Sequence, residues 1–111
     1  MRFFQSAVQR VGALVFLPPL VPAEIPQGGV ANENEMLSAM HRYRKYNSDV
    51  ERYLRFLEFS AATQRLSSVA HNRLHNDAVH TLRRVIERFN AQVRIYKARS
   101  DVRSASSRLL H

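Results

Sequence analysis

Apolar residues between Val30 and His111 recur at alternating intervals of four and three, and no glycine, proline or cysteine interrupts them. The first run, which includes one asparagine, reads Met36, Met40, Tyr43, Asn47, Val50, Leu54, Leu57 and Ala61. The second run reads Val79, Leu82, Ile86, Phe89, Val93 and Tyr96. This spacing places one apolar seam along each of two helices. We therefore predict an all-α, coiled-coil-like fold in which two helices pack lengthwise.

The start of the first helix carries a clear signal. Asn32 can accept a hydrogen bond from the free amides of the first turn, and Glu35 three residues later completes a capping box. We expect this helix to run from about Glu33 to Phe59.

The turn between the two helices is marked less sharply. No glycine or proline occurs between Ser60 and Ser68, but the apolar register breaks there and small polar residues gather. This break favours an antiparallel hairpin over one long bent helix. The second helix is then expected from about Thr63 to Ser100 or slightly beyond.

The first thirty residues hold all three glycines and all four prolines. Residues 1–23 combine two arginines, an acid-free apolar run and the small-residue sequence Val21-Pro22-Ala23, which is typical of a secretory signal. A mitochondrial presequence and an uncleaved apolar arm remain alternatives. We expect a secreted or periplasmic protein, a Pro/Gly linker over 24–31, a hairpin over 32–103 and a frayed tail over 104–111.

The formal net charge of +8 is concentrated in the second half. Residues 31–60 carry five basic and five acidic groups, whereas residues 61–111 carry ten basic and three acidic ones. A basic helix attracts an acidic protein, an anionic membrane surface or nucleic acid. The candidate basic face consists of Arg83, Arg84, Arg88, Arg94, Lys97, Arg99 and Arg103.

No constellation of residues indicates catalysis. The acids are scattered, the chain has no cysteine, and no glycine-rich phosphate loop is present. His71 and His75 share one helix face and could bind a metal, but two histidines alone are more typical of a solvated face. We therefore predict a protein that is not an enzyme and has no metal and no cofactor.

The seams point to an interaction role. Two narrow seams in a chain of 111 residues cannot enclose a core from all sides, so we expect self-association or docking on a larger assembly. A polar residue in a seam, here Asn47, commonly fixes the pairing of helices. Aromatic residues interleaved with arginines could stack on bases, although this spacing favours a helical core.

Two segments carry a family resemblance: Tyr46–Glu58, which reads YNSDVERYLRFLE, and Val85–Arg99, which reads VIERFNAQVRIYKAR. The chain resembles small uncharacterised proteobacterial secreted proteins over roughly residues 25–99. The resemblance implies a signal peptide, a Pro-containing segment like Ile25-Pro26-Gln27-Gly28 and a helical hairpin. Those proteins usually have a cysteine where Phe56 stands here, so a shared disulfide is not expected.

The sequence thus predicts a non-enzymatic structural or protein-interaction hairpin with a basic second helix. A small basic accessory subunit of a mitochondrial membrane complex and a hairpin that binds nucleic acid without sequence preference are the alternatives.

Overall fold

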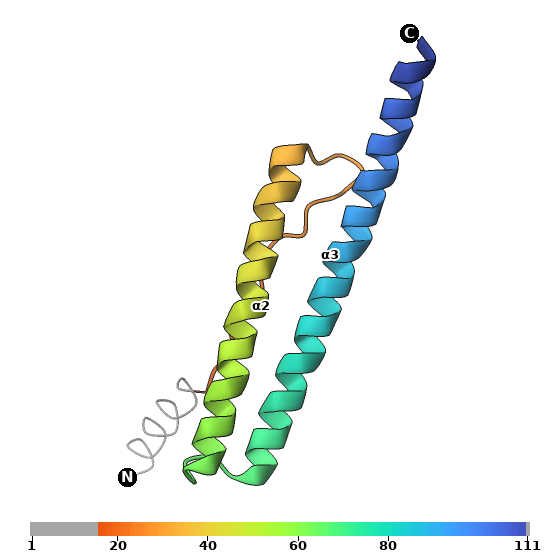
Figure 1. The fold of residues 1–111 in the computed structure, drawn as a ribbon. Coiled ribbons are helices and arrows are strands. Elements are labelled where there is room, and N and C mark those ends of the chain that lie inside the picture. Colours follow the sequence, from red (N-terminus) through yellow and green to blue (C-terminus); the bar gives the residue numbers. More distant parts are fainter. Residues whose placement is uncertain (1–15, 111) are drawn as a thin grey trace.

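The protein is an antiparallel helical hairpin crossed on one side by an extended segment (Figure 1). The computed structural model describes residues 16–110, and their side chains as far as residue 104. Within residues 16–110 the elements are helix α2, Glu33–Ala62, and helix α3, Ser68–Leu110, with no strand. The predicted all-α hairpin is confirmed. No helix in this part of the chain is long and apolar enough to cross a membrane.

A capping box begins α2. The side chain of Asn32 accepts a hydrogen bond from the amide of Glu35 at 2.8 Å, and the carboxylate of Glu35 accepts one from the amide of Asn32 at 3.3 Å. Glu33 and Glu35 place negative charge beside the positive end of the helix dipole. The helix therefore starts at the residue that the sequence predicts.

The turn lies between Thr63 and Ser67. Gln64 has a φ of 61°, and the amide of Arg65 donates to the carbonyl of Ser60 at 2.8 Å, so the α2 C-terminus is closed by backbone hydrogen bonds. The Ser67 hydroxyl then accepts from the amide of Ala70 at 3.1 Å, which makes it the cap of α3. Hence α3 begins at Ser68 and not at Thr63.

The far end of α3 reaches Leu110, whereas the sequence predicts a helix that ends at Ser100 or slightly beyond and a frayed tail over 104–111. Residues 101–110 contain no glycine or proline, so nothing in the sequence stops the helix there.

Residues 16–31, which we call the strap, form no helix and pass along one side of the hairpin (Figure 1). At one end of the strap Phe16 packs on Phe56 of α2, with ring centroids 5.5 Å apart. At its other end the amide of Gly28 donates to Oε1 of Gln92 in α3 at 2.9 Å. The strap therefore runs antiparallel to α2, from near the turn to the start of that helix.

The core is formed by a heptad row of α2 and a shorter row of α3. Buried positions of α2 alternate at intervals of three and four: Met36, Ala39, Tyr43, Tyr46, Val50, Tyr53, Leu57 and Ser60. Buried apolar residues of α3 are Ala78, Val85 and Phe89. Fewer residues of α3 are buried because only its inner edge meets α2 and the strap.

Candidate interaction surfaces

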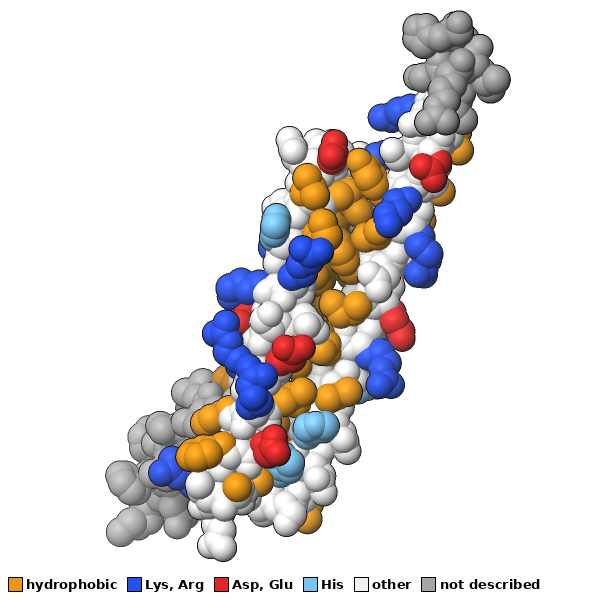
Figure 2. All heavy atoms as spheres, viewed as in Figure 1, with side chains coloured by type: hydrophobic (Ala, Val, Ile, Leu, Met, Phe, Trp, Pro, Cys, Tyr) orange, Lys and Arg blue, Asp and Glu red, His pale blue; other side chains and the backbone are white. Residues whose placement is uncertain are grey.

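The two sides of the hairpin differ in what covers them. The strap covers one side, and the opposite side, which we call the open face, has a groove between α2 and α3 (Figure 2). Figure 2 shows apolar side chains gathered along this groove between charged edges. Two hollows of about 540 and 460 Å³, both bordered by Met40, make up the groove. Their apolar lining comes from Met36, Leu37, Met40, Tyr43, Ile86, Phe89, Val93 and Tyr96.

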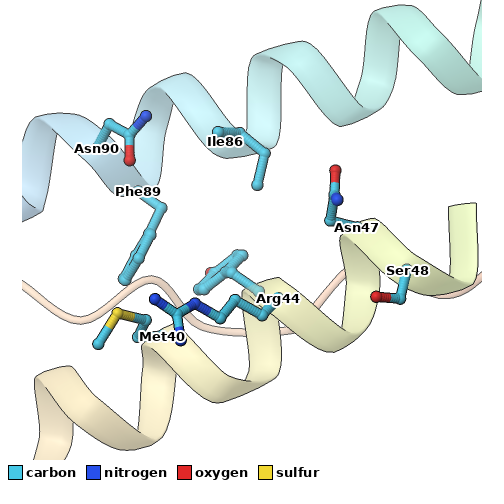
Figure 3. Close-up of a pocket in the computed structure, with 8 residues that line it drawn as sticks. Met40, Arg44, Asn47, Ser48, Ile86, Phe89 and Asn90 are labelled. Carbon is cyan, nitrogen blue, oxygen red and sulfur yellow. The ribbon is translucent and has the colours of Figure 1, made fainter. Parts of the chain in front are cut away.

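The middle of the open face is shown in Figure 3. The rings of Tyr43 and Phe89 stack with centroids 4.5 Å apart and an interplanar angle of 20°, which closes the hairpin at this level. Ile86 from α3 and Asn47 from α2 border the same hollow, and the Arg44 side chain extends along its α2 edge (Figure 3). The lining thus combines an apolar floor with a few polar groups at the rim.

Asn47 is half-buried at this rim. Its amide nitrogen donates to Oε1 of Glu51 at 3.3 Å, one turn further along the same helix. The predicted role of Asn47 was to fix helix pairing, but within the described hairpin its hydrogen bond stays inside α2. The Asn47 side chain lines the groove and points toward α3 (Figure 3).

The helices hold the strap through its main chain. The Tyr53 hydroxyl donates to the carbonyl of Phe16 at 2.6 Å, and the Tyr43 hydroxyl donates to the carbonyl of Glu24 at 3.1 Å. Arg99 donates to the carbonyl oxygens of Gly29, at 2.6 Å, and of Ala31. Because the acceptors are backbone groups, these bonds recognise an extended chain more than its side chains.

Gly28 marks the closest approach of the strap to α3. A Cβ atom at this position would overlap the carbonyl oxygen of Gln92 and lie 2.8 Å from the amide nitrogen of Tyr96. At Gly29 the nearest atom to such a Cβ is a methyl carbon of Ile95 at 4.0 Å, an ordinary contact. Glycine is therefore required at 28 for steric reasons and is replaceable at 29.

Burial raises the pKa of three tyrosines under or beside the strap. Desolvation raises the pKa of Tyr46 above 10.0. It also raises the pKa of Tyr53, where the charge of Asp77 adds to the effect, and that of Tyr43, where Arg42 partly opposes it. The folded protein thus favours the neutral phenols.

The predicted basic face does not form a single surface. Residues 83, 94 and 97 lie on the outer side of α3 next to the open face, whereas 84 and 88 lie toward the strap side, as the 100° step of a helix requires. Arg99 differs from the other six because it is half-buried, bonds to the strap and lies 5.3 Å from the centroid of the Tyr96 ring. Arg103 lies beyond the level of Glu33, where α2 starts, since Ser100 borders the same hollow as Glu33.

The two histidines that could bind a metal lie one turn apart near the start of α3. The ring centroids of His71 and His75 are 6.0 Å apart, and Nε2 of His71 is buried without a hydrogen-bond partner. No third ligand joins them, since the described part of the chain contains no cluster of three metal-ligating side chains.

The predicted seam occupies the open-face half of the interface. Met36, Tyr43, Val50, Leu57 and Phe89 are buried. The remaining seam residues are half-buried: Met40, Asn47, Leu54, Val79, Leu82, Ile86, Val93 and Tyr96. Sequence reasoning missed the strap-facing half, made of Ala39, Tyr46, Tyr53, Ser60, Ala78 and Val85. These positions also follow heptad spacing, so a second apolar row beside the first was the available signal.

Comparisons with protein-family models, curated proteins and solved structures give no match for this chain. The resemblance to proteobacterial secreted proteins stays a prediction.

Proposed function

We propose that the chain is a non-enzymatic, self-associating hairpin whose open face packs on the open face of a second copy. The single observation that carries this proposal is the groove, because apolar side chains of both helices line it, four of them half-buried, on the side without a strap. An amphipathic surface of this kind fits the apolar face of another helical pair. A second hairpin would complete a four-helix bundle.

The spacing of side chains along the seam on the open-face side is self-complementary in an antiparallel arrangement. In a two-fold symmetric contact, residue i of one copy meets residue j of the other and the reverse also holds. On α3, Val79 and Val93 each lie seven residues from Ile86. On α2, Met40 and Leu54 each lie seven residues from Asn47. A two-fold axis near Asn47 and Ile86 would therefore pair apolar residues on both helices.

Charges at the α2 edge support the same arrangement. Arg44 and Glu51 are exposed and lie on one line of α2, at equal distances on either side of the midpoint between residues 47 and 48. Around the proposed axis, Arg44 of one copy faces Glu51 of the other, twice in each dimer. The two Asn47 amides would meet at the axis, where a polar pair specifies register.

The basic residues on the outer side of α3 remain solvent-facing in such a pair. They would be available to an acidic protein or an anionic membrane surface. Their spread over two flanks of the helix gives the nucleic-acid alternative no additional support.

Sedimentation of the full chain over a range of concentrations tests self-association, and a charge swap tests its geometry. Arg44→Glu and Glu51→Arg should each weaken the dimer, whereas the double variant should restore it, because opposite charges again face each other. Arg52→Glu, an exposed change on another side of α2, serves as the matched control. A folded wild-type chain that stays monomeric at all concentrations would refute the proposal, as would a double variant that is no better than either single one.

Export remains a proposal, supported by the composition of residues 1–23. Its rival is mitochondrial import. N-terminal sequencing of the protein from its native source shows whether residues 1–23 are removed. A start at Glu24 supports cleavage after Ala23, and an intact Met1 excludes both cleaved-leader hypotheses.

A further inference from the structure

We propose that the groove beneath the strap is a binding site for extended, proline-containing peptide segments of a partner protein, and that the strap occupies it in cis in the uncleaved chain, which retains residues 16–23. This site lies on the opposite side of the hairpin from the open face, so it stands independently of self-association. The inference starts from the way in which the strap is bound.

The helices supply the contacts that recognise a polyproline-like chain. Such segments bind in grooves lined with aromatic side chains whose polar ends bond to backbone carbonyls. Here Tyr46 and Tyr53 border the space next to Pro18 and Pro19, and the Tyr53 hydroxyl bonds to the carbonyl of Phe16. The groove therefore has contacts for both the main-chain carbonyls and the proline rings of a bound segment.

The central part of the strap is held more loosely than its ends. Between Phe16 and Glu24, whose carbonyls accept the two tyrosine hydroxyls, no hydrogen bond joins the described residues of the strap to the helices. A hollow of about 230 Å³ remains among Pro18, Pro19, Val21 and the side chains beneath them. Leu20 is 93% exposed. A partner segment with a better fit could therefore fill this space.

Displacement of the strap is controlled at its C-terminal end, where Gly28 fits against the α3 backbone and Arg99 binds the carbonyls of Gly29 and Ala31. While these anchors hold, the strap is present at an effective concentration on the order of millimolar, which excludes a weak competitor. Loosening the anchors should expose the groove without changing the aromatic side chains that line it.

The test uses the full chain and a fluorescently labelled synthetic peptide with the sequence of residues 16–31, followed by anisotropy. Gly28→Val should unseat the tethered strap and raise peptide affinity by at least about tenfold over wild type, because the peptide still carries the required glycine. Gly29→Val is the matched control, since its side chain meets no close atom, and it should behave as wild type.

Two changes test the recognition itself. In the Gly28→Val chain, Tyr53→Phe should weaken peptide binding roughly fivefold through loss of one hydrogen bond. A peptide with alanine at positions 18, 19 and 22 should also bind more weakly, since it loses the preformed extended conformation. A peptide with valine at position 28 should lose most of its affinity.

Arg99→Met provides a second way to loosen the strap if Gly28→Val fails to fold, as judged by circular dichroism. The proposal is overturned if neither folded variant binds the peptide better than wild type. It is also overturned if the alanine peptide binds as tightly as the proline-containing one. Neither result bears on the charge-swap experiment at the open face, so the two proposals can fail separately.

Discussion

Tyr43 stacks on Phe89 across the two helices, and the same tyrosine donates its hydroxyl hydrogen to the strap carbonyl of Glu24. One side chain of α2 thus contacts both of the elements that pack against that helix. The arrangement explains why Tyr43 is only 2% exposed although it lies in the middle of a two-helix hairpin. Its ring is covered by α3 and its polar end by the strap.

Truncation of the stacked partner should destabilise the fold strongly. Phe89→Ala removes the ring that covers Tyr43 and leaves a cavity, so the free energy of unfolding should fall by about 3–5 kcal/mol. Urea denaturation followed by circular dichroism measures this change. Asn90→Ala, at an exposed neighbouring position, should shift the same value by less than about 0.5 kcal/mol. Equal effects of the two substitutions would contradict the packing described here.

A thermodynamic cycle can isolate the contribution that the strap makes near the turn to the free energy of unfolding. Tyr53→Phe should cost about 1 kcal/mol in the full chain, because it removes the hydrogen bond to the Phe16 carbonyl. In a chain that starts at Glu24 the acceptor is gone, so the same substitution should cost close to nothing. Denaturant titrations of the four proteins give the coupling. A cost that persists in the shortened chain would mean that the hydroxyl has another role.

Alkaline pH should weaken the folded state. The pKa values of Tyr43, Tyr46 and Tyr53 are raised above 10.0 by burial, so the unfolded chain loses these protons at a lower pH than the folded chain. Their contribution to stability is therefore complete below about pH 10 and is lost as pH rises through the folded pKa values. Helical ellipticity and tyrosinate absorbance, recorded together, should change in the same range. Tyr46→Phe should reduce the pH sensitivity, and an unchanged alkaline profile in this variant would argue against burial as its source.

The helix cap offers a local test. Asn32→Ala removes the acceptor for the amide of Glu35 and should lower the free energy of unfolding by about 1 kcal/mol. Hydrogen exchange should show faster opening of the first turn of α2. Asn34→Ala changes an exposed residue in the same turn and serves as its control, with little expected effect. If both variants exchange alike, the capping box does not stabilise this helix end.

The sequence was sufficient for the presence and order of the two helices, for the start of α2 and for half of the helix interface, but not for the two ends of α3. The row through Met36, Tyr43, Val50 and Leu57 follows from local periodicity, and the start at Glu33 follows from the Asn32 cap, because both depend on residues close in sequence. The other half was missed for a different reason. A row through residues 40 and 47 and a row through residues 39 and 46 both satisfy heptad spacing, so the spacing alone does not show which of them is buried.

The strap determines which of the two rows is fully buried. It covers the side of α2 that carries Tyr46 and Tyr53, whereas the side with Met40 and Asn47 borders the open groove. A segment rich in proline has no helical or strand period, so its docking leaves no periodic signal in the sequence. Its contacts also join residues up to 70 positions apart, such as Arg99 and Gly29. Local pattern alone could not predict that arrangement.

The strap also changes where the chain begins and ends in space. An antiparallel hairpin ordinarily brings its entry and exit points to the same pole. Here the sixteen residues of the strap carry the entry point back to Phe16, beside Phe56 near the turn, whereas α3 continues to Leu110 at the opposite pole (Figure 1). Whatever is joined to the two ends of this segment is thereby held apart by the length of the hairpin, as it would be by a rigid spacer.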